Sequence, residues 1–354
     1  MRDSSTRSFS AVGSRMQYER DRHRKKKRLI TAAILIITVL IVFFSVLILG
    51  EIFHWFGSKD PGEDSSHIHV NFDSEKLVSS EDVHKGDLIL INASFPYTFP
   101  EVSDTYLPLY ENRNKHSYTN AAGELKTVYA YYTQTAKSCA KLESNTLKAL
   151  NAMADDFFKA TNNIDLFVYD QDGYRTYEEQ AERYNKNPLK YAPAGQTEHH
   201  TGKCVDLYVY TMDKVFANLD DPAFASIYRW IYDNAYRYGF TLRYPSAKVS
   251  TTGVNYEPYH FRYIGYAHAF YMQQNNLCLE EYLDLLRDNH TFDKKLEIRG
   301  DDGFDYLVYY VPKAADSMTT LKVPSEAEGV SYEISGDNKE GFIVTVKVAK
   351  TSQE

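Results

Sequence analysis

The chain has 354 residues, of which 43% are hydrophobic and 25% are charged, so it can bury a core and is not disordered throughout. Its net charge of −8 hides an asymmetry, because residues 1–28 carry +7 and the remaining chain carries −15. We expect no nucleic-acid partner, since such binding needs a basic surface and the body of this chain is acidic. Three cysteines in a chain of this length exclude a disulfide-scaffolded mini-protein.

The first 67 residues predict a membrane anchor. Residues 29–49 are 21 uncharged, mostly apolar residues, the length that a helix needs to cross a bilayer core. A basic run lies directly before them, so the positive-inside rule places residues 1–28 in the cytoplasm and the chain after residue 50 outside the cell membrane. A cleaved signal peptide is the alternative, but its apolar region would be shorter and no small-residue cleavage site follows. Residues 50–67 are predicted to be a linker, because residues 57–67 are polar and contain Pro and Gly.

The next segments alternate between strand and helix patterns. Residues 68–130 contain short apolar runs, such as 87–92, bounded by turn residues. We expect this segment, a β-leaning lead-in to the main domain, to contain mainly short strands. The spacing of apolar residues predicts helices over 138–159 and 177–184, and a third that opens at Asp221-Pro222 and ends at Gly239. Strands are predicted over 164–169 and 240–244, and Asp206 is predicted on a strand, on the face opposite its valine neighbours.

Beyond about residue 293 the pattern changes to alternating strands only. These strands are predicted over residues 304–311, 319–323, 330–335 and 341–348, separated by Gly, Asp, Asn and Pro. The sequence therefore predicts an α+β chain with a main domain over 68–292 and a small β module over 293–354.

The segment Thr197-Glu198-His199-His200-Thr201-Gly202-Lys203-Cys204-Val205-Asp206 contains the first candidate metal ligands. Imidazole and carboxylate groups both suit zinc. His199 and Asp206 are seven residues apart, and Gly202 between them allows the chain to turn back, so both side chains can reach one ion. Two ligands alone do not make a zinc site, and a buried Asp often caps a backbone amide instead.

Two further segments supply complementary groups. Glu257 and His260 are three residues apart, close enough for one to bind a metal while the other takes a proton from water. Taken alone, this segment favours an exposed Glu and a packed His. Arg175 follows a predicted strand and turn, where a cation could hold an oxyanion or a substrate carboxylate.

In this order and spacing the three segments resemble the VanY-like D-alanyl-D-alanine carboxypeptidases, a family of the zinc peptidase group that includes lysostaphin-type and hedgehog-like domains. The family pattern is Ser-x-His-x-x-Gly-x-Ala-x-Asp, preceded by Gly-Tyr-Arg-Ser and followed by Glu-Pro-Trp-His-Tyr/Phe-Arg. The match covers roughly residues 80–290. The resemblance implies an antiparallel-sheet zinc peptidase domain with flanking helices.

Carried over by position, the resemblance implies roles for eight residues. The zinc ligands are His199, Asp206 and His260. Glu257 is the general base, and Arg175 polarises the scissile carbonyl and stabilises the oxyanion. The substrate-binding residues are Thr197, Gln180 and Tyr259.

The departures of the sequence from the family pattern remove neither a ligand nor the base. Thr197 replaces Ser and keeps the hydroxyl, Tyr259 replaces Trp, and Asp172 stands where Ser is common. Cys204 replaces Ala; its thiol is either a competing metal ligand or a small buried residue.

The resemblance implies a zinc carboxypeptidase that removes terminal D-Ala from peptidoglycan stem peptides or their lipid-linked precursor, and the apolar run 29–49 predicts that it is anchored in the membrane. An L,D-carboxypeptidase acting on tetrapeptide stems shares the motifs and is the first alternative. A non-catalytic cell-wall-binding module is the second, although the intact Glu257 argues against it.

Overall fold

The computed structural model describes residues 68–101, 106–120, 122–134, 139–210, 216–315, 318–325 and 327–350. The predicted tail, transmembrane helix and linker (1–28, 29–49 and 50–67) lie outside these ranges. None of the helices within them is long and apolar enough to cross a bilayer. Residues Ile68–Glu354 form one compact unit.

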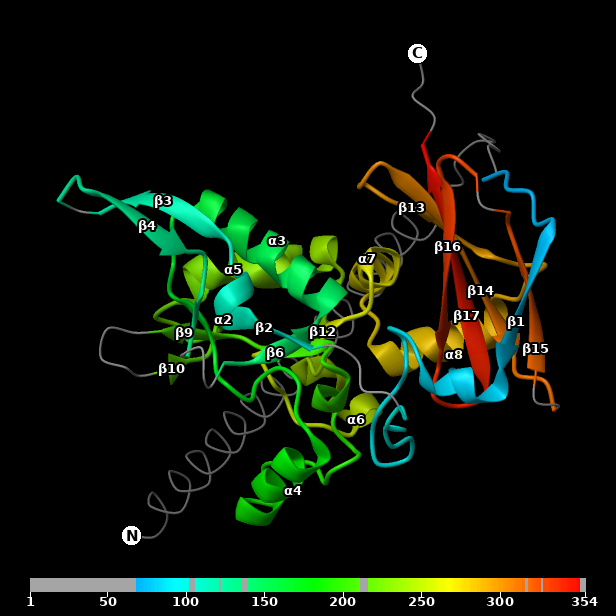
Figure 1. Ribbon diagram of the computed structural model, residues 1–354, viewed down its shortest axis with the longest axis horizontal. Helices are drawn as coiled ribbons and strands as arrows, with labels where there is room; N and C mark the ends of the chain where they lie inside the picture. The colour runs from blue at the N-terminus through cyan, green and yellow to red at the C-terminus, as the bar shows by residue number, and fades with distance from the viewer. Residues whose placement is uncertain are drawn as a thin grey trace, which may run out of the picture. The chain divides into compact units, whose positions relative to one another are not determined.

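The described residues confirm the α+β class, with helices and mostly antiparallel strands interspersed (Figure 1). The α-helices are α2 (Leu109–Asn112), α3 (Ser144–Thr161), α4 (Tyr177–Lys186), α5 (Ala225–Asn234), α6 (Val249–Thr252), α7 (Tyr266–Asn275) and α8 (Leu279–Asn289). Short 3-10 helices are η1 (Ser80–His84), η2 (Glu198–Thr201), η3 (Ala235–Tyr238) and η4 (Ser246–Lys248).

The strands form several small sheets. Those before residue 265 are β1 (Ser74–Ser79), β2 (Tyr106–Pro108), β3 (Lys115–Thr119), β4 (Leu125–Tyr129), β5 (Tyr132–Thr133), β6 (Lys141–Glu143), β7 (Leu166–Val168), β8 (Cys204–Asp206), β9 (Tyr208–Tyr210), β10 (Phe216–Ala217), β11 (Phe240–Leu242) and β12 (His260–Tyr263). Those after it are β13 (Leu296–Arg299), β14 (Phe304–Pro312), β15 (Met318–Val323), β16 (Val330–Gly336) and β17 (Gly341–Ala349).

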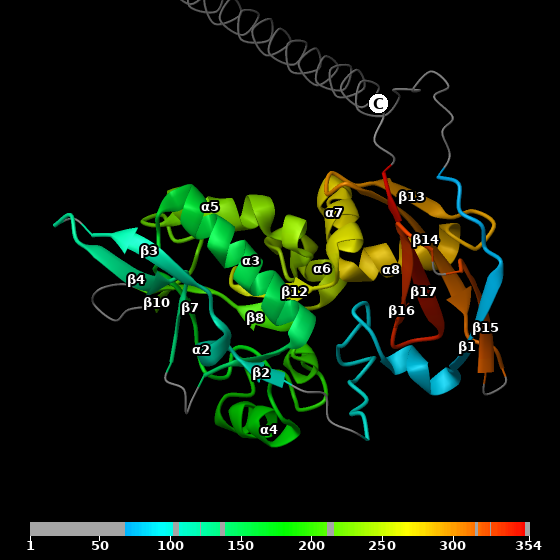
Figure 2. The ribbon, with the colours of Figure 1, turned by 45° about the horizontal axis from the view of Figure 1, so that its top comes forward.

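A three-stranded antiparallel sheet, in the order β11-β12-β8, supports the candidate site. One of its faces is apolar: Val205 of β8 and Phe261 of β12 are fully buried in a core that α3 completes with Leu150, Met153 and Phe157. Both ribbon views show α3 beside this sheet (Figures 1 and 2). Because strand side chains alternate between faces, the opposite face of β8 and β12 is left for polar side chains.

The C-terminal strands pair in the order β13-β14-β17-β16. The alternating pattern predicted β14, β16 and β17 but missed β13, and the remaining predicted strand, β15, belongs to another sheet. Even-numbered residues of β14, such as Tyr306 and Val308, pack in one cluster with Tyr282 of α8. Odd-numbered residues, such as Leu307, pack in another with Val78 of β1. The lead-in therefore contributes to this module, since β1 pairs with β15 from Ser74↔Val323 to Ser79↔Met318. The boundary placed at residue 293 remains a prediction.

Three local predictions were wrong in detail. The apolar run 87–92 is not a strand; its residues 88–91 are buried and are held by loop contacts, such as that from the Leu90 amide to the Asp337 carbonyl at 3.2 Å. The helix placed at 138 begins at Ser144, because the Glu143 carboxylate caps the first amides of α3. The helix placed at Asp221-Pro222 begins at Ala225, because the Asp221 carbonyl first accepts hydrogen bonds in a turn.

Candidate active site

The register of β8 and β12 brings two of the predicted ligands together. His260 lies directly opposite Asp206, and Arg262 lies opposite Cys204. Residues opposite each other in an antiparallel pair share a face, so these four side chains lie on the polar face of the sheet. The sequence pattern predicted the strand position of Asp206, and the structure confirms it.

His199 reaches the same place from the short helix η2, which precedes β8. Thr197 is the N-cap of η2 and accepts a hydrogen bond from the His199 amide. Gly202 ends η2 with a φ of +65°, and a Cβ at this position would lie 2.6 Å from the ring of Tyr106. Glycine is therefore required where the chain turns from His199 back into β8.

The three predicted ligands converge on one point. Nε2 of His199 lies 3.4 Å from Oδ2 of Asp206, and Nδ1 of His260 lies 2.7 Å from Oδ1. The other imidazole nitrogens are occupied elsewhere: Nδ1 of His199 donates to the Gly173 carbonyl at 2.7 Å, and Nε2 of His260 faces Glu198 at 3.4 Å. Outer partners of this kind orient histidines that bind a metal.

The donor set fits a zinc ion. Two imidazole nitrogens and a carboxylate, all nearly inaccessible to solvent, are the ligand types of known catalytic zinc sites. A second group of donor atoms overlaps with it: the ligand atoms of His199, Cys204 and His260 all lie within 4.8 Å of one another. Although burial and Arg175 would lower the pKa of His199, the neighbouring Cys204 and Asp206 raise it to about 9. Metal binding must therefore displace a proton from this cluster.

Glu257 lies at the edge of this cluster. Its Oε2 is 4.0 Å from Nδ1 of His260, and about a quarter of its side chain is exposed. Two contacts hold its loop: the Glu257 amide donates to the Tyr244 carbonyl at 3.1 Å, and the Tyr232 hydroxyl donates to the Pro258 carbonyl at 2.6 Å. Burial raises the pKa of Glu257, in part opposed by His260. A carboxylate with a raised pKa suits a general base.

Arg175 is buried beside the ligands and is fixed by several acceptors. Its guanidinium donates to Asp172 at 3.3 Å, to Gln180 at 3.3 Å and to Asp206 at 3.5 Å, and its Nε donates to the Gln171 carbonyl. Gln180 is in turn held by the Ala192 carbonyl at 2.6 Å. Gln180, predicted to bind substrate, thus contacts Arg175, and its own role remains a prediction.

All eight predicted site residues line one cavity of about 170 Å³. They are Arg175, Gln180, Thr197, His199, Asp206, Glu257, Tyr259 and His260. Tyr259 stacks on Tyr208 at a ring distance of 5.1 Å. The structure thus brings together every residue of the prediction, whereas their individual roles remain predictions.

The sequence reasoning missed Glu198, which lies behind His260. It is fully buried between Arg243 at 2.8 Å and Arg262 at 3.1 Å. Burial alone would raise the pKa of Glu198, but the charges of these two arginines hold it well below its usual range. Arg243 also forms a two-pronged ion pair with Glu280 of α8, at 2.7 and 2.9 Å. These partners are far apart in sequence, so no local pattern could have identified them.

Asp172 was noted as a departure, and the structure places its carboxylate in the cavity beside Arg175. Burial and the nearby Asp206 raise the pKa of Asp172 to about 6, although Arg175 opposes this.

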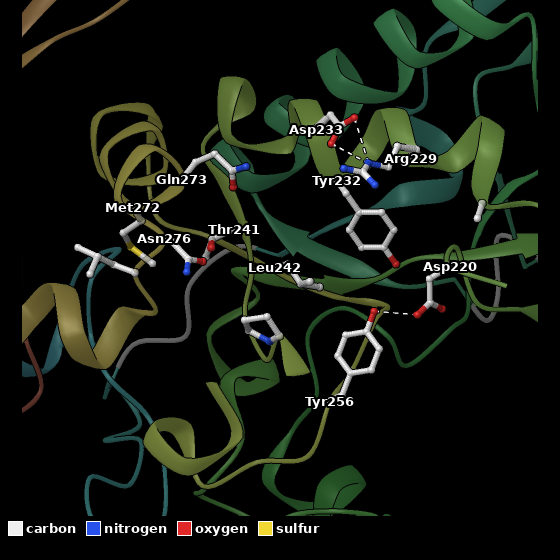
Figure 3. Close-up of a pocket in the computed structure, with 13 residues that line it drawn as sticks. Asp220, Arg229, Tyr232, Asp233, Thr241, Leu242, Tyr256, Met272, Gln273 and Asn276 are labelled. Atoms are coloured by element: carbon white, nitrogen blue, oxygen red, sulfur yellow. Dashed lines mark hydrogen bonds and ion pairs between the residues drawn. The ribbon is translucent and has the colours of Figure 1, made fainter. Parts of the chain in front are cut away.

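A larger cavity of about 470 Å³ lies outside the predicted site (Figure 3). Tyr232 and Tyr256 line it, and Tyr256 donates to Asp220 at 2.7 Å. None of the eight predicted residues lines this cavity. Tyr256 and Glu257 are neighbours in the chain but face different cavities. The candidate active site is the smaller cavity, because the predicted ligands and the predicted base line it.

Comparison with known proteins gives consistent matches. The family model described as "VanY: D-alanyl-D-alanine carboxypeptidase" matches residues 140–266. A D-alanyl-D-alanine carboxypeptidase of Enterococcus faecium is 32% identical over 274 residues, which cover 77% of this chain and 78% of that protein. The putative carboxypeptidase YodJ of Bacillus subtilis is 28% identical, over 61% of this chain and 74% of its own length.

Among solved structures, the vancomycin-resistance D,D-dipeptidase VanXYg, determined in complex with a D-Ala-D-Ala phosphinate analogue, is similar. It superposes with a TM-score of 0.61 and 25% sequence identity, over 77% of this chain and 98% of that one.

Proposed function

The chain belongs to the VanY family of D-alanyl-D-alanine carboxypeptidases, and on this basis we propose that it is a zinc-dependent hydrolase that removes the terminal D-Ala of peptidoglycan stem peptides. The observation that carries the proposal is the register pair His260↔Asp206. It sets both ligands beside His199 on one face of a sheet, with Glu257 and Arg175 in the same cavity.

His199, Asp206 and His260 would hold the zinc ion. When bound, zinc lowers the pKa of a coordinated water and polarises a carbonyl oxygen. The protein's own contribution is orientation: Gly173 and Glu198 fix the two imidazole rings through their outer nitrogens. Arg175 contacts Asp206 from the other side at 3.5 Å.

Glu257 acts as the general base in this proposal. Its carboxylate lies on the cavity side of His260 and accepts a proton from the attacking water. It then donates this proton to the nitrogen of the leaving D-Ala, which departs as a neutral amine when the peptide bond breaks. The raised pKa of Glu257 makes it both a competent acceptor and a competent donor.

Arg175 stabilises the negative charge that develops on the carbonyl oxygen of the scissile bond. Because Asp172, Gln180 and the Gln171 carbonyl hold its guanidinium in place, the arginine needs little reorganisation when the charge appears. The cavity volume of about 170 Å³ suits a terminal residue with a small side chain. Two further cations of the lining, Arg183 and Lys190, are available for the terminal carboxylate.

The N-terminal sequence supports a membrane-anchored enzyme with its catalytic unit outside the cell. In this arrangement residues 29–49 span the membrane once, and residues 1–28 remain in the cytoplasm. The compact unit then faces peptidoglycan or its lipid-linked precursor. Since the unit is acidic, tethering and not charge attraction would keep it near anionic wall polymers.

Amino-acid release tests the proposal. The purified chain is incubated with a muropeptide ending in D-Ala-D-Ala, with and without a chelator, and free D-Ala is measured. We expect release of one D-Ala per peptide, abolished by chelation and restored by zinc. Cleavage of the tetrapeptide but not the pentapeptide would instead identify an L,D-carboxypeptidase, and no release from either would overturn the proposal.

A D,D-dipeptidase activity is a second candidate, favoured by the similarity to the VanXYg structure over 98% of that chain. Free D-Ala-D-Ala is the test substrate. A ratio of kcat/KM that favours the free dipeptide over the pentapeptide would assign the chain to dipeptidases, and the reverse ratio is expected.

A further inference from the structure

Cys204 is the residue of the metal-ligand cluster to which the proposed reaction gives no role. It lies two residues before Asp206 on β8, so the two side chains share a face of the strand. The residue between them, Val205, points into the hydrophobic core. Cys204 is fully buried, so its thiol is directed away from that core and toward the two histidines.

The geometry of the cluster matches a four-donor site. The Cys204 sulfur and one nitrogen each of His199 and His260 lie within 4.8 Å of one another. Asp206 lies 3.4 and 2.7 Å from the same two imidazoles. A tetrahedral zinc ion with bonds of about 2.0–2.3 Å places its donors about 3.3–3.8 Å apart. Small side-chain movements, which include a separation of the Asp206–His260 pair from 2.7 Å, would therefore put all four groups on one ion.

The surroundings argue against a purely packing role for this thiol. Its cross-strand partner is Arg262, a buried cation that pairs with Glu198 at 3.1 Å. The diagonal neighbour on β12 is His260, which shares the polar face. A small apolar side chain would satisfy packing at this position, whereas sulfur adds a strong donor for zinc.

We propose that Cys204 is a fourth protein ligand of the metal in the resting enzyme, completing a site with His199, Asp206 and His260. This inference rests on the proposed function, because it takes the same metal site as its premise. A catalytic zinc site keeps one position open for water, whereas a site with four protein ligands is closed. Cys204 must therefore leave the metal before turnover. While it is bound, the enzyme holds the metal more tightly and its hydrolytic activity is lower.

Cobalt substitution of the purified full-length chain tests the ligand directly. Thiolate bound to Co²⁺ gives an intense near-ultraviolet charge-transfer absorption that nitrogen and oxygen ligands do not give. We expect this absorption in the wild-type protein and its loss in Cys204→Ala and Cys204→Ser. Cys278→Ser is the matched control, because this buried cysteine is the N-cap of α8, a position that serine favours. It should keep the absorption.

Zinc affinity and D-Ala release are measured on the same four proteins. Cys204→Ala should bind zinc at least about tenfold more weakly, because loss of a ligand should cost at least as much affinity as loss of a group that only orients a ligand. At saturating zinc this variant should release D-Ala faster than the wild type. A wild-type protein that binds cobalt and releases D-Ala, but shows no charge-transfer absorption, would overturn the role of Cys204 and leave the proposed function standing. A protein that binds no metal would overturn both.

Discussion

Glu198 and His260 face each other behind the metal-ligand cluster, with 3.4 Å between Oε2 of the glutamate and Nε2 of the histidine. The glutamate comes directly before His199 in the chain, so the same short helix supplies one ligand and the support for another. Arg243 and Arg262 keep the Glu198 carboxylate ionised. An ionised acceptor holds the proton on Nε2 and leaves Nδ1 of His260 free for a metal.

We therefore expect Glu198→Gln to weaken zinc binding by about 10–100-fold, because the acceptor of His260 loses its charge. It should also lower the free energy of unfolding by at least about 3 kcal/mol, since a buried charge loses its partner. Zinc competition with a chromogenic chelator and urea unfolding measure the two effects.

Glu280→Gln is the matched control for this prediction. Glu280 pairs with Arg243 but has no contact with His260 among its described ion pairs, so this variant should lose stability and keep its zinc affinity. Equal loss of zinc affinity in both variants would show that Glu198 acts only through general stability.

Glu257→Gln should retain zinc and lose activity. Gln keeps the size of the side chain but cannot accept the proton of water, and a general base contributes about 10²–10⁴-fold to a rate. Metal analysis and D-Ala release are measured on the same sample. His260→Ala should instead lower the zinc content itself. A Glu257→Gln enzyme with near wild-type turnover would show that the base has been misassigned.

Arg175→Lys should lower kcat by about 10²–10³-fold with little change in KM, because a lysine keeps the charge but loses the planar fork that Asp172 and Gln180 position. Steady-state kinetics with the pentapeptide separate the two parameters. A raised KM with unchanged kcat would mean that Arg175 binds the substrate carboxylate and does not stabilise the oxyanion.

The pH dependence of stability has a specific source away from the metal site. His268 of α7 is buried between the Tyr282 hydroxyl at 2.8 Å and the Thr345 hydroxyl at 3.0 Å, and burial lowers its pKa from 6.5 to about 3. Between these two values the unfolded chain binds a proton that the folded chain does not. Stability from His268 is therefore complete above pH 6.5 and decreases as the pH falls toward 3, by up to about 1.4 kcal/mol per unit.

His268→Gln keeps hydrogen-bonding groups but removes this titration. Between pH 7.5 and pH 5, the free energy of unfolding should fall by about 2 kcal/mol more in the wild type than in the variant. Urea unfolding of the metal-free proteins at the two pH values measures the difference. Parallel losses in both proteins would assign the acid sensitivity to other groups.

Local sequence patterns predicted the strands in which apolar and polar residues alternate, because this alternation alone shows which side chains share a face. The alternation around Val205 predicted the polar face of β8, and the strands beyond 304 were found within one or two residues. The buried run 88–91 has the composition of a strand, but its backbone partners are loop residues distant in sequence, such as Asp337. The family resemblance predicted the cavity residues. The contact of Glu198 with His260 joins residues 62 positions apart, which no local pattern shows.

The pairing of β1 with β15 has a consequence for how the protein is made. Ser79 lies opposite Met318, so nearly the whole unit must be synthesised before the first strand finds its partner. Until then Val78 and Val83 lack the residues of the C-terminal sheet that bury them. Contacts so distant along the chain slow folding, because a long loop must close before any of them forms. A nascent chain that is released early would thus expose apolar side chains near residue 80, a natural target for chaperones and proteases.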